Sequence, residues 1–284
     1  MKTRRLPVPA LILALVLALL TGCGPAEGKK TVTGTGLDKL GTVNVISREE
    51  GSGTREVFSK TLGLFDDSTG RDEITEDALK EESGDKVIEA VSEDESAIGY
   101  VSLGLLDSSK GKVHTVTVDG KSLNRNFYLA YSGKLSELEK DFLTYVEGKG
   151  QEIVGENYQT VKKTTTFLSG KPKGTIKIGG SSSVASLMQE LSDAYMQINP
   201  NAEITVVTTD STNGLTGAMS GIYDLGMASR ELKDYEKELL DYDVIAKDEV
   251  AVIVQKDNPL KNISSQDLKK IYSGEMKEWK ELAD

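Results

Sequence analysis

Two hydrophobic patterns alternate along the chain: short apolar runs rich in β-branched residues, and longer segments with apolar residues at helical spacing. The short runs predict strands, because β-branched side chains pack well on a sheet. The predicted strands are residues 42–46, 97–101, 113–118, 127–131, 175–178, 204–208 and 250–254. Strands that alternate with helices indicate an α/β fold rather than a β-sandwich or a helical bundle.

Helical spacing predicts three amphipathic helices. They are residues 85–91, 136–147 and 184–198. Ser136 and Glu139 form the pair of a capping box, which favours a helix start at this point. Residues 162–174 are rich in lysine, threonine, glycine and proline, and this composition predicts a linker.

The first 22 residues combine a basic start with an apolar run over residues 10–20. This run is too short to span roughly 30 Å of hydrocarbon, so a secretory signal peptide is favoured over a membrane-spanning helix. Small residues before Cys23 resemble the bacterial lipobox, in which the cysteine becomes the lipidated first residue of the mature protein. The alternative is an ordinary signal peptide with an incidental cysteine. Residues 23–40 then form a tether.

Composition narrows the classes of function. The 284 residues include one Cys and one His, which excludes a disulfide framework, a multi-cysteine zinc site and a paired Cys/His nucleophile. The formal charge of −11 repels nucleic acid and anionic lipid, and no basic patch offsets it. Nothing pairs a nucleophile with a base, and His114 in an alternating strand suits a structural role. The sequence therefore favours a binding protein without cofactor or metal over an enzyme.

Three loops share one arrangement, in which a strand ends, a run of Ser, Thr and Gly follows, and a helix begins. They are residues 45–54, 178–183 and 207–214. A helix N-terminus leaves backbone N–H groups unpaired at the positive end of the helix dipole. Hydroxyls at such a terminus can grip an oxyanion together with these N–H groups, or simply cap the helix. Glycines in all three loops would let an anion approach the backbone, which favours the first interpretation.

Arg48 is the natural counter-charge for such an anion, because its planar guanidinium offers paired donors to a tetrahedral oxyanion. The alternative for Arg48 is a salt bridge to Glu49, Glu50 or another surface acid. A fourth loop, residues 223–231, supplies Ser229, a further arginine and one carboxylate. A carboxylate repels a fully ionised dianion such as sulfate, but it accepts a hydrogen bond from a protonated phosphate.

Several segments together resemble the phosphate-binding lipoproteins of bacterial phosphate ABC transporters. They read "GTIKIGGSSSVASLMQELSDAYMQINPNAEITVV", "IYDLGMASREL", "DEVAVIVQKDNPLKNISSQDLKKIYSGEMKEWKEL", "SREEGSGTREVF" and "AIGYVSLG", and the resemblance covers nearly all of residues 41–284. It implies a two-lobed α/β clamshell of the type II periplasmic-binding-protein class, with the anion between lobes joined by two crossovers. The implied function is an extracytoplasmic, lipid-anchored receptor that delivers inorganic phosphate to an ABC permease.

The resemblance also implies the phosphate ligands, position by position. They are Arg48, Ser52, Gly53, Thr54, Ser182, Ser183 and Ser211. The family places an aspartate acceptor just after the "G-A-S" of the fourth loop, where this chain has Ser229, Arg230 and Glu231. This departure makes Arg230 a candidate further donor. It leaves the acceptor carboxylate open among Glu50, Asp224 and Glu231.

The order of the segments differs from the family, in which "GGSSS" comes first and "SREEGSGTR" follows "YSGEMKEWKEL". The exchange resembles a circular permutation in which residues 162–174 join the old termini. Lobe A then covers 113–254, and lobe B is assembled from 41–107 and 258–284. A fragment of a longer tandem protein is the competing account.

Two other functions remain open at this point. The same fold can bind another oxyanion, such as sulfate, molybdate or tungstate. It can also serve a surface lipoprotein that senses or adheres.

Overall fold

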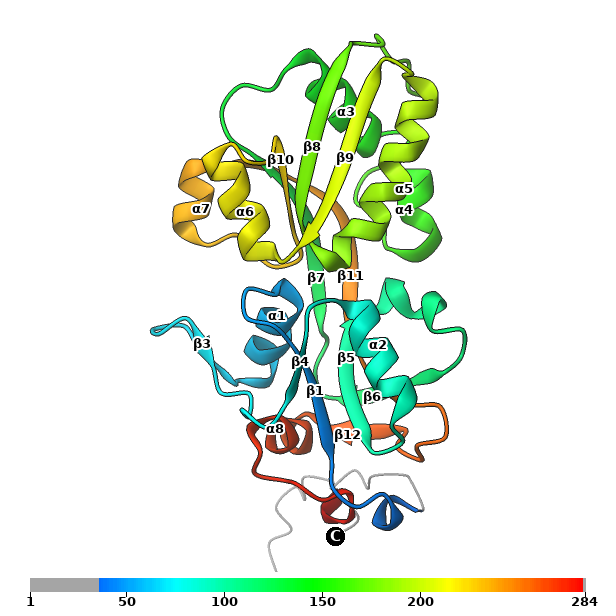
Figure 1. Cartoon of the computed structure of the whole chain (residues 1–284), viewed down its shortest axis with the longest axis vertical. Helices are drawn as coiled ribbons and strands as arrows, with labels where there is room; N and C mark the ends of the chain where they lie inside the picture. Colours follow the sequence, from blue (N-terminus) through cyan, green and yellow to red (C-terminus); the bar gives the residue numbers. More distant parts are fainter. Residues whose placement is uncertain (1–35, 283–284) are drawn as a thin grey trace, which may run out of the picture. The chain divides into compact units, whose positions relative to one another are not determined.

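The computed structural model describes residues 36–282. The predicted signal peptide and Cys23 lie outside the described residues, as does most of the predicted tether. Each strand predicted from the sequence is confirmed (Figure 1). They are β1 (Asn44–Arg48), β5 (Ala97–Ser102), β6 (Val113–Asp119), β7 (Asn124–Tyr131), β8 (Gly174–Ser181), β9 (Ala202–Thr209) and β11 (Asp241–Gln255).

The predicted helices are confirmed as α2 (Gly84–Glu93), α3 (Glu137–Glu147) and α5 (Ser182–Ile198). Both hydrogen bonds of the capping box between Ser136 and Glu139 are present. The remaining elements are α1 (Gly53–Leu62), α4 (Gln151–Asn157), α6 (Ser211–Ser220), α7 (Asp234–Leu239), α8 (Ser265–Ser273), β2 (Phe65–Asp66), β3 (Arg71–Asp72), β4 (Leu79–Glu81), β10 (Leu225–Ala228), β12 (Asn262–Ser264), and the 3-10 helices η1 (Leu37–Lys39), η2 (Leu103–Ser109) and η3 (Trp279–Leu282).

The long strand β11 connects two groups of strands. Its first part pairs antiparallel with β7, and its second part pairs antiparallel with β5 and β6. On the β5 side, β1 lies parallel between β5 and β4. On the β7 side, β10 pairs antiparallel with β7 and parallel with β8, which pairs parallel with β9. The two groups of strands define two lobes, and β7 and β11 pass between them (Figure 1).

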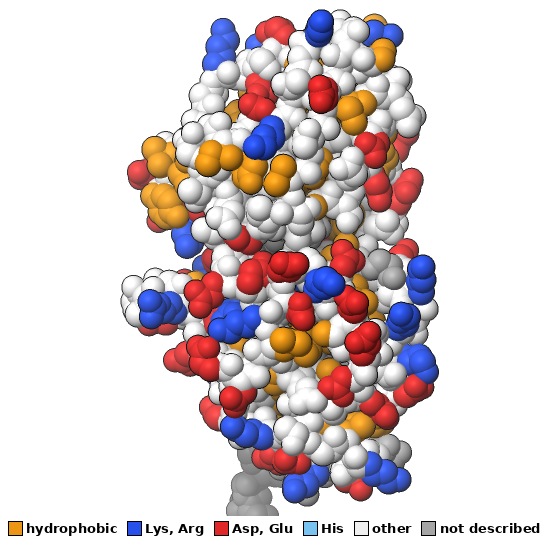
Figure 2. Space-filling model, viewed as in Figure 1, with side chains coloured by type: hydrophobic (Ala, Val, Ile, Leu, Met, Phe, Trp, Pro, Cys, Tyr) orange, Lys and Arg blue, Asp and Glu red, His pale blue; other side chains and the backbone are white. Residues whose placement is uncertain are grey.

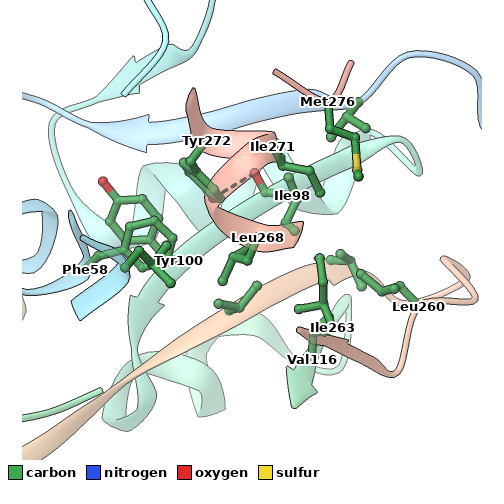
Figure 3. Close-up of a cluster of buried hydrophobic side chains, with 14 of the residues drawn as sticks. Phe58, Ile98, Tyr100, Val116, Leu260, Ile263, Leu268, Ile271, Tyr272 and Met276 are labelled. Atoms are coloured by element: carbon green, nitrogen blue, oxygen red, sulfur yellow. Dashed lines mark hydrogen bonds between the residues drawn. The ribbon is translucent and has the colours of Figure 1, made fainter. Parts of the chain in front are cut away.

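Lobe B is built around aromatic side chains from segments far apart in the sequence (Figure 3). The rings of Phe58 and Tyr100 stack with centroids 4.0 Å apart, and the edge of Tyr272 meets Phe58 at 4.6 Å. Tyr272 belongs to α8, whose Leu268 and Ile271 are also buried. Lobe B therefore depends on residues from both ends of the described chain.

Lobe A has its own core, formed mainly by α3 and α5 packed against β7 and β8. Phe142 of α3 meets Tyr195 of α5 edge-to-face, with centroids 5.2 Å apart. Val184, Met188 and Leu191 of α5 are fully buried in the same cluster. The amphipathic faces predicted from sequence are thus the faces that the lobe buries.

The structure places the lobe boundaries differently from the sequence-based assignment of 113–254 to lobe A. Val113 and Val116 of β6, and Val252 and Val254 of β11, pack in the lobe B clusters. Lobe A is therefore residues 127–246. At the later boundary, the difference arises because β11 passes between the lobes and contributes to both cores within one continuous strand. At the earlier boundary, β6 pairs with β11 and β12 in lobe B, and its own sequence does not indicate these partners.

Residues 162–173 form no regular element, as predicted for a linker. The two ends of the described chain meet in lobe B. Val43 N donates to Lys277 O at 2.8 Å, and Trp279 N donates to Gly41 O at 2.9 Å. The Trp279 indole is buried and donates to Ser96 O at 2.9 Å, directly before β5. Ser96 O also accepts from Asn44 N of β1 at 3.0 Å, so η3 is held close to the starts of both strands.

Charged side chains dominate much of the surface. On the face drawn in Figure 2, acidic and basic side chains are interspersed, and apolar side chains gather over α6 and α7. Ile222, Tyr235 and Leu239 of that region are 48–59% exposed. Within residues 36–282, no helix has the length and apolar character that a membrane span requires.

Candidate anion-binding site

The loop between β1 and α1 holds four of the predicted ligands. Ser52 is the N-cap of α1, and its hydroxyl accepts from the Arg55 backbone N–H at 3.4 Å. Arg48 is 2% exposed. Its guanidinium donates to both carboxylate oxygens of Glu49 (2.9 and 2.8 Å) and, through Nη2, to Ser182 Oγ at 3.0 Å. Arg48 therefore makes the salt bridge that was the alternative interpretation, and it also reaches a predicted ligand on lobe A.

The serines that open α5 face the β1–α1 loop. Ser181 is the N-cap of α5, but its side chain does not cap the helix. Its hydroxyl instead donates to Ser229 Oγ at 2.9 Å. Ser183 Oγ lies 2.9 Å from Thr54 Oγ1. Together with the bond between Arg48 and Ser182, this contact connects the two lobes through predicted ligands.

Ser211 joins the same group because another residue caps its helix. Asp210 accepts from Asn213 N at 2.8 Å and so caps α6. The Ser211 hydroxyl is left to accept from Ser229 N at 3.0 Å, and it lies 3.4 Å from Ser229 Oγ. Both serines are fully buried. We call the hydroxyls of Thr54, Ser181, Ser182, Ser183, Ser211 and Ser229 the hydroxyl cluster.

Gly53 allows the β1–α1 loop to lie against this cluster. A Cβ atom at this position would collide with Ser211 Oγ and would lie 2.7 Å from Ser229 Oγ. A larger residue would therefore push the loop away from the cluster. That the glycines of these loops also let an anion approach the backbone remains a prediction. Thr212 N also donates to Gly51 O at 3.3 Å, which adds a contact between α6 and the loop.

Arg230 lies beside the cluster, but its guanidinium is held by carboxylates. Its Nη1 and Nη2 donate to the two carboxylate oxygens of Glu236 at 2.8 and 2.9 Å, and Nε lies 3.2 Å from Glu56 of α1. Nη2 also lies 3.3 Å from Thr212 Oγ1. Arg230 thus connects the lobes through ion pairs and makes no hydrogen bond to the hydroxyl cluster.

The three candidate acceptor carboxylates lie apart from the cluster. Glu50 is exposed. Asp224 accepts from Lys177 N at 2.7 Å at the other end of β8. Glu231 accepts from the Tyr128 hydroxyl and lines a pocket of about 900 Å³ beside the crossover strands. None of the three has a hydrogen bond to the cluster among the described residues, so the structure does not bring them together with the predicted donors.

Two acids that were not predicted as acceptor carboxylates, Glu49 and Asp210, lie closer to the cluster. Glu49 binds Arg48, and Asp210 caps α6. Burial raises the pKa of Glu49 above its usual value, although the charge and hydrogen bonds of Arg48 act to lower it and the charge of Asp210 adds to the rise. The pair at Arg230 behaves differently. Burial also acts to raise the pKa of Glu236, but the hydrogen bonds and charge of Arg230, together with the Lys233 backbone N–H and charge, outweigh it and the pKa is lowered.

Arg125 is the main residue near the site that sequence reasoning missed. It lies on β7, its side chain is 1% exposed, and its Nη1 donates to Thr54 Oγ1 at 2.7 Å and to Ser229 Oγ at 3.3 Å. A single arginine in the segment "NRNFYLAY" reads as a surface residue at a strand start. Its buried partner, Asp248, is 123 residues away in the sequence.

The hydroxyl cluster and the adjoining Arg48 and Arg125 together offer hydroxyl and guanidinium donors from four loops and β7, a set suited to a buried tetrahedral oxyanion. Within residues 36–282, no three His, Cys, Asp or Glu side chains lie close enough together to hold a metal ion.

Comparison with known proteins gives consistent results. The model of the PBP superfamily domain matches residues 165–284. The chain is 35% identical to phosphate-binding protein PstS 2 of Streptococcus pneumoniae over 256 residues, which cover 85% of this chain and 88% of that protein. A crystal structure of a phosphate-binding protein of a phosphate ABC transporter from S. pneumoniae is similar, with a TM-score of 0.69, and the match covers 85% of this chain and all of that one. The PstS protein of Staphylococcus haemolyticus is 40% identical over 118 residues, 39% of this chain and 37% of that protein.

Proposed function

This chain belongs to the family of PstS phosphate-binding proteins, and from that premise we propose that it binds inorganic phosphate outside the cytoplasm and delivers it to an ABC permease. The observation that carries the proposal is the hydroxyl cluster. Its members come from the start of α1, α5 and α6 and from the end of β10, and Arg48 touches it. Such a set of donors matches the four oxygens of phosphate.

In this proposal, phosphate takes the place of the hydrogen bonds that the hydroxyls now make with one another. Ser182, Ser183 and Ser211 donate from lobe A. Arg48 and Thr54 donate from lobe B, together with the backbone N–H groups at Ser52 and Gly53. Because the ligands are divided between lobes, a bound anion holds the lobes together, and its release requires them to separate.

The proposed role is binding rather than catalysis. The cluster contains hydroxyls and guanidinium groups without a histidine or another neutral base beside a serine. His114 lies on β6, where its Nε2 meets Leu260 O at 2.9 Å in lobe B. This contact suits a structural role for the imidazole.

We further propose that Cys23 carries a lipid that anchors the protein to the outer face of the cell membrane. Substitution Cys23→Ser should move the protein from the membrane fraction to the medium. Mass spectrometry of the wild-type N-terminus should find an acylated Cys23. An unmodified Cys23 in membrane-bound protein would contradict the anchor.

The order of segments is best explained, we propose, by a circular permutation with the linker at 162–173. The S. pneumoniae relative matches 85% of the chain, whereas the match to the Staphylococcus protein covers a share close to that of residues 174–284 alone. Hydrogen bonds between residues 41–43 and 277–279 support the same account. A variant that joins residue 282 to residue 41 and opens the chain within the linker should fold and bind phosphate. The control is a variant with a lengthened linker, which should still fold and bind phosphate. If the control does so and the rejoined variant neither folds nor binds, the permutation is refuted.

Calorimetric titration of the purified chain tests the central proposal. Phosphate should bind with one-to-one stoichiometry, and sulfate should bind more weakly. The absence of heat with phosphate, or equal or tighter binding of sulfate, would overturn the assignment of phosphate as the ligand.

A further inference from the structure

We infer that Arg125 supplies a second positive charge to the anion site and orients two hydroxyls of the cluster toward the ligand. The inference rests on the proposed function and deepens it, because it assigns a positioning residue that the resemblance does not provide. It also predicts which protonation state of phosphate the site prefers.

The crossover strands hold Arg125 in a fixed place. Arg125 of β7 lies directly opposite Asp248 of β11, in the stretch where the two crossovers pair with each other. Asp248 accepts from Nε at 2.9 Å and lies 2.8 Å from Nη2. It also accepts from Ser102 Oγ at 2.9 Å. These contacts leave Nη1 as the part of the guanidinium that faces away from Asp248.

Nη1 points at the hydroxyl cluster and contacts both lobes. It donates to Thr54 Oγ1 of lobe B and to Ser229 Oγ of lobe A. Each of these hydroxyls is bonded to another member of the cluster, Thr54 to Ser183 and Ser229 to Ser181.

The direction of these bonds makes the hydroxyls donors toward a ligand. A hydroxyl that accepts from a guanidinium keeps its own proton for another acceptor, and the charge strengthens that second bond. Ser229 accepts from both Arg125 and Ser181, so its proton is directed to another acceptor. In this structure Ser211 Oγ lies in that position at 3.4 Å, and a bound anion can replace it. Arg125 therefore acts on the anion through Thr54 and Ser229, and its charge acts at short range in a buried site.

The arginines near the site differ in whether they form a hydrogen bond to the hydroxyl cluster. Arg230 is held by Glu236 and Glu56, and it has no hydrogen bond to the cluster. Arg48 and Arg125 each have one carboxylate partner and at least one hydroxyl of the cluster. The guanidinium nitrogens that face the cluster attract a dianion more strongly than a monoanion, and the paired carboxylates Glu49 and Asp248 oppose part of this preference.

The test uses the full chain and calorimetric titration with inorganic phosphate over the pH range in which phosphate changes from monoanion to dianion. In the wild type, affinity should rise with pH. Arg125→Gln should lower affinity at least about tenfold at the alkaline end, less at the acidic end, and so flatten the profile. Arg125→Lys, which keeps the charge, should restore the rise with pH at reduced affinity.

A double substitution keeps the test decisive if Arg125→Gln does not fold. Arg125→Gln with Asp248→Asn replaces the buried ion pair by two amides and leaves no unpaired charge. The matched control is Tyr195→Phe with Asp141→Asn, since the Tyr195 hydroxyl donates to Asp141 at 2.7 Å in lobe A, about three turns along α5 from the hydroxyl cluster. The control should lower the melting temperature and leave phosphate affinity within about twofold.

The proposed function and the inference about Arg125 can be refuted separately. If the wild type does not bind phosphate, the proposed function fails. If the wild type binds phosphate and Arg48→Ala weakens binding, but the Arg125 variants keep wild-type affinity and pH profile, only the inference about Arg125 is overturned. A control pair that weakens binding as strongly as the Arg125 pair would also overturn it, because the effect would then be general destabilisation.

Discussion

Arg48 and Arg230 lie at similar positions relative to their strands but have different hydrogen-bond partners. Each arginine lies at or just beyond the end of a buried strand, and each is at most 2% exposed. Arg48 shares its guanidinium between Glu49 and Ser182. Arg230 instead binds Glu236 with two hydrogen bonds and pairs with Glu56 of the other lobe.

The difference lies in the carboxylate partners. Glu49 is on the same loop as Arg48 and is partly exposed, and burial raises its pKa, so the ionised carboxylate is poorly stabilised there. Glu236 is fully buried at the start of α7, and hydrogen bonds from Arg230 lower its pKa. In the proposed function, the first pair exchanges a partner for the anion, whereas the second stays paired as part of the fold. A buried arginine beside a site is therefore a ligand only where its own carboxylate leaves a donor free.

The largest expected effect is on stability at Arg230. Arg230→Ala should lower the free energy of unfolding by about 3–5 kcal/mol, because it leaves Glu236 buried without its partner. Chemical denaturation measures this change, and Arg71→Ala on the exposed β3 strand serves as the control. A variant with wild-type stability that has lost phosphate binding would show that Arg230 is a ligand, which would remove the contrast with Arg48.

The second effect is on affinity at Arg48. Arg48→Ala should weaken phosphate binding by roughly ten- to over a hundredfold, since a charge-assisted hydrogen bond contributes about 1.5–3 kcal/mol. Calorimetric titration measures the affinity. Thermal melting without ligand should show a smaller loss than for Arg230→Ala. Unchanged affinity would make the pair with Glu49 the whole role of Arg48.

The third effect separates two serines that sequence reasoning treated alike. Ser52 caps α1, so Ser52→Ala should cost about 0.5–2 kcal/mol of stability in the absence of ligand. Ser182 caps no helix through its side chain and accepts from Arg48, so Ser182→Ala should weaken phosphate binding with little change in melting temperature. If Ser52→Ala weakens binding without destabilising the chain, its hydroxyl is a ligand after all.

These contrasts also show what the sequence could predict. Apolar runs predicted β1, β5, β6, β8 and β9, but not the short strands β2, β3, β4, β10 and β12. Ser/Gly runs predicted the loops of Thr54, Ser182 and Ser211. The first part of β11 was missed because Asp241, Asp243, Lys247 and Asp248 interrupt its apolar pattern. Helix α8 was also missed, although Leu268, Ile271 and Tyr272 are buried at helical spacing.

The parts of the site that could not be predicted from the sequence share one cause. Local sequence indicates which residues can donate to an anion, but it does not indicate which carboxylate will occupy each donor. Glu236, six residues after Arg230, and Asp248, 123 residues after Arg125, decide what their arginines do. Those pairings arise only when β10 meets α7 and when the two crossover strands pair.

The smallest expected effect is the uptake of protons by Glu49 when phosphate binds. Because burial raises its folded-state pKa above the ordinary value, the ionised carboxylate lowers stability at neutral pH, and this cost disappears as the pH falls through the raised pKa. A dianion beside Arg48 would raise that pKa further. Phosphate binding at mildly acidic pH should therefore take up a fraction of one proton at Glu49, and this contribution should strengthen binding as the pH falls.

Calorimetry in buffers of different ionisation enthalpy measures the net uptake, and subtracting the value for Glu49→Gln removes the protons exchanged by phosphate itself. Equal uptake in both proteins would mean that Glu49 stays ionised on Arg48 when the anion binds, and that Arg48 holds its carboxylate as firmly as Arg230 does.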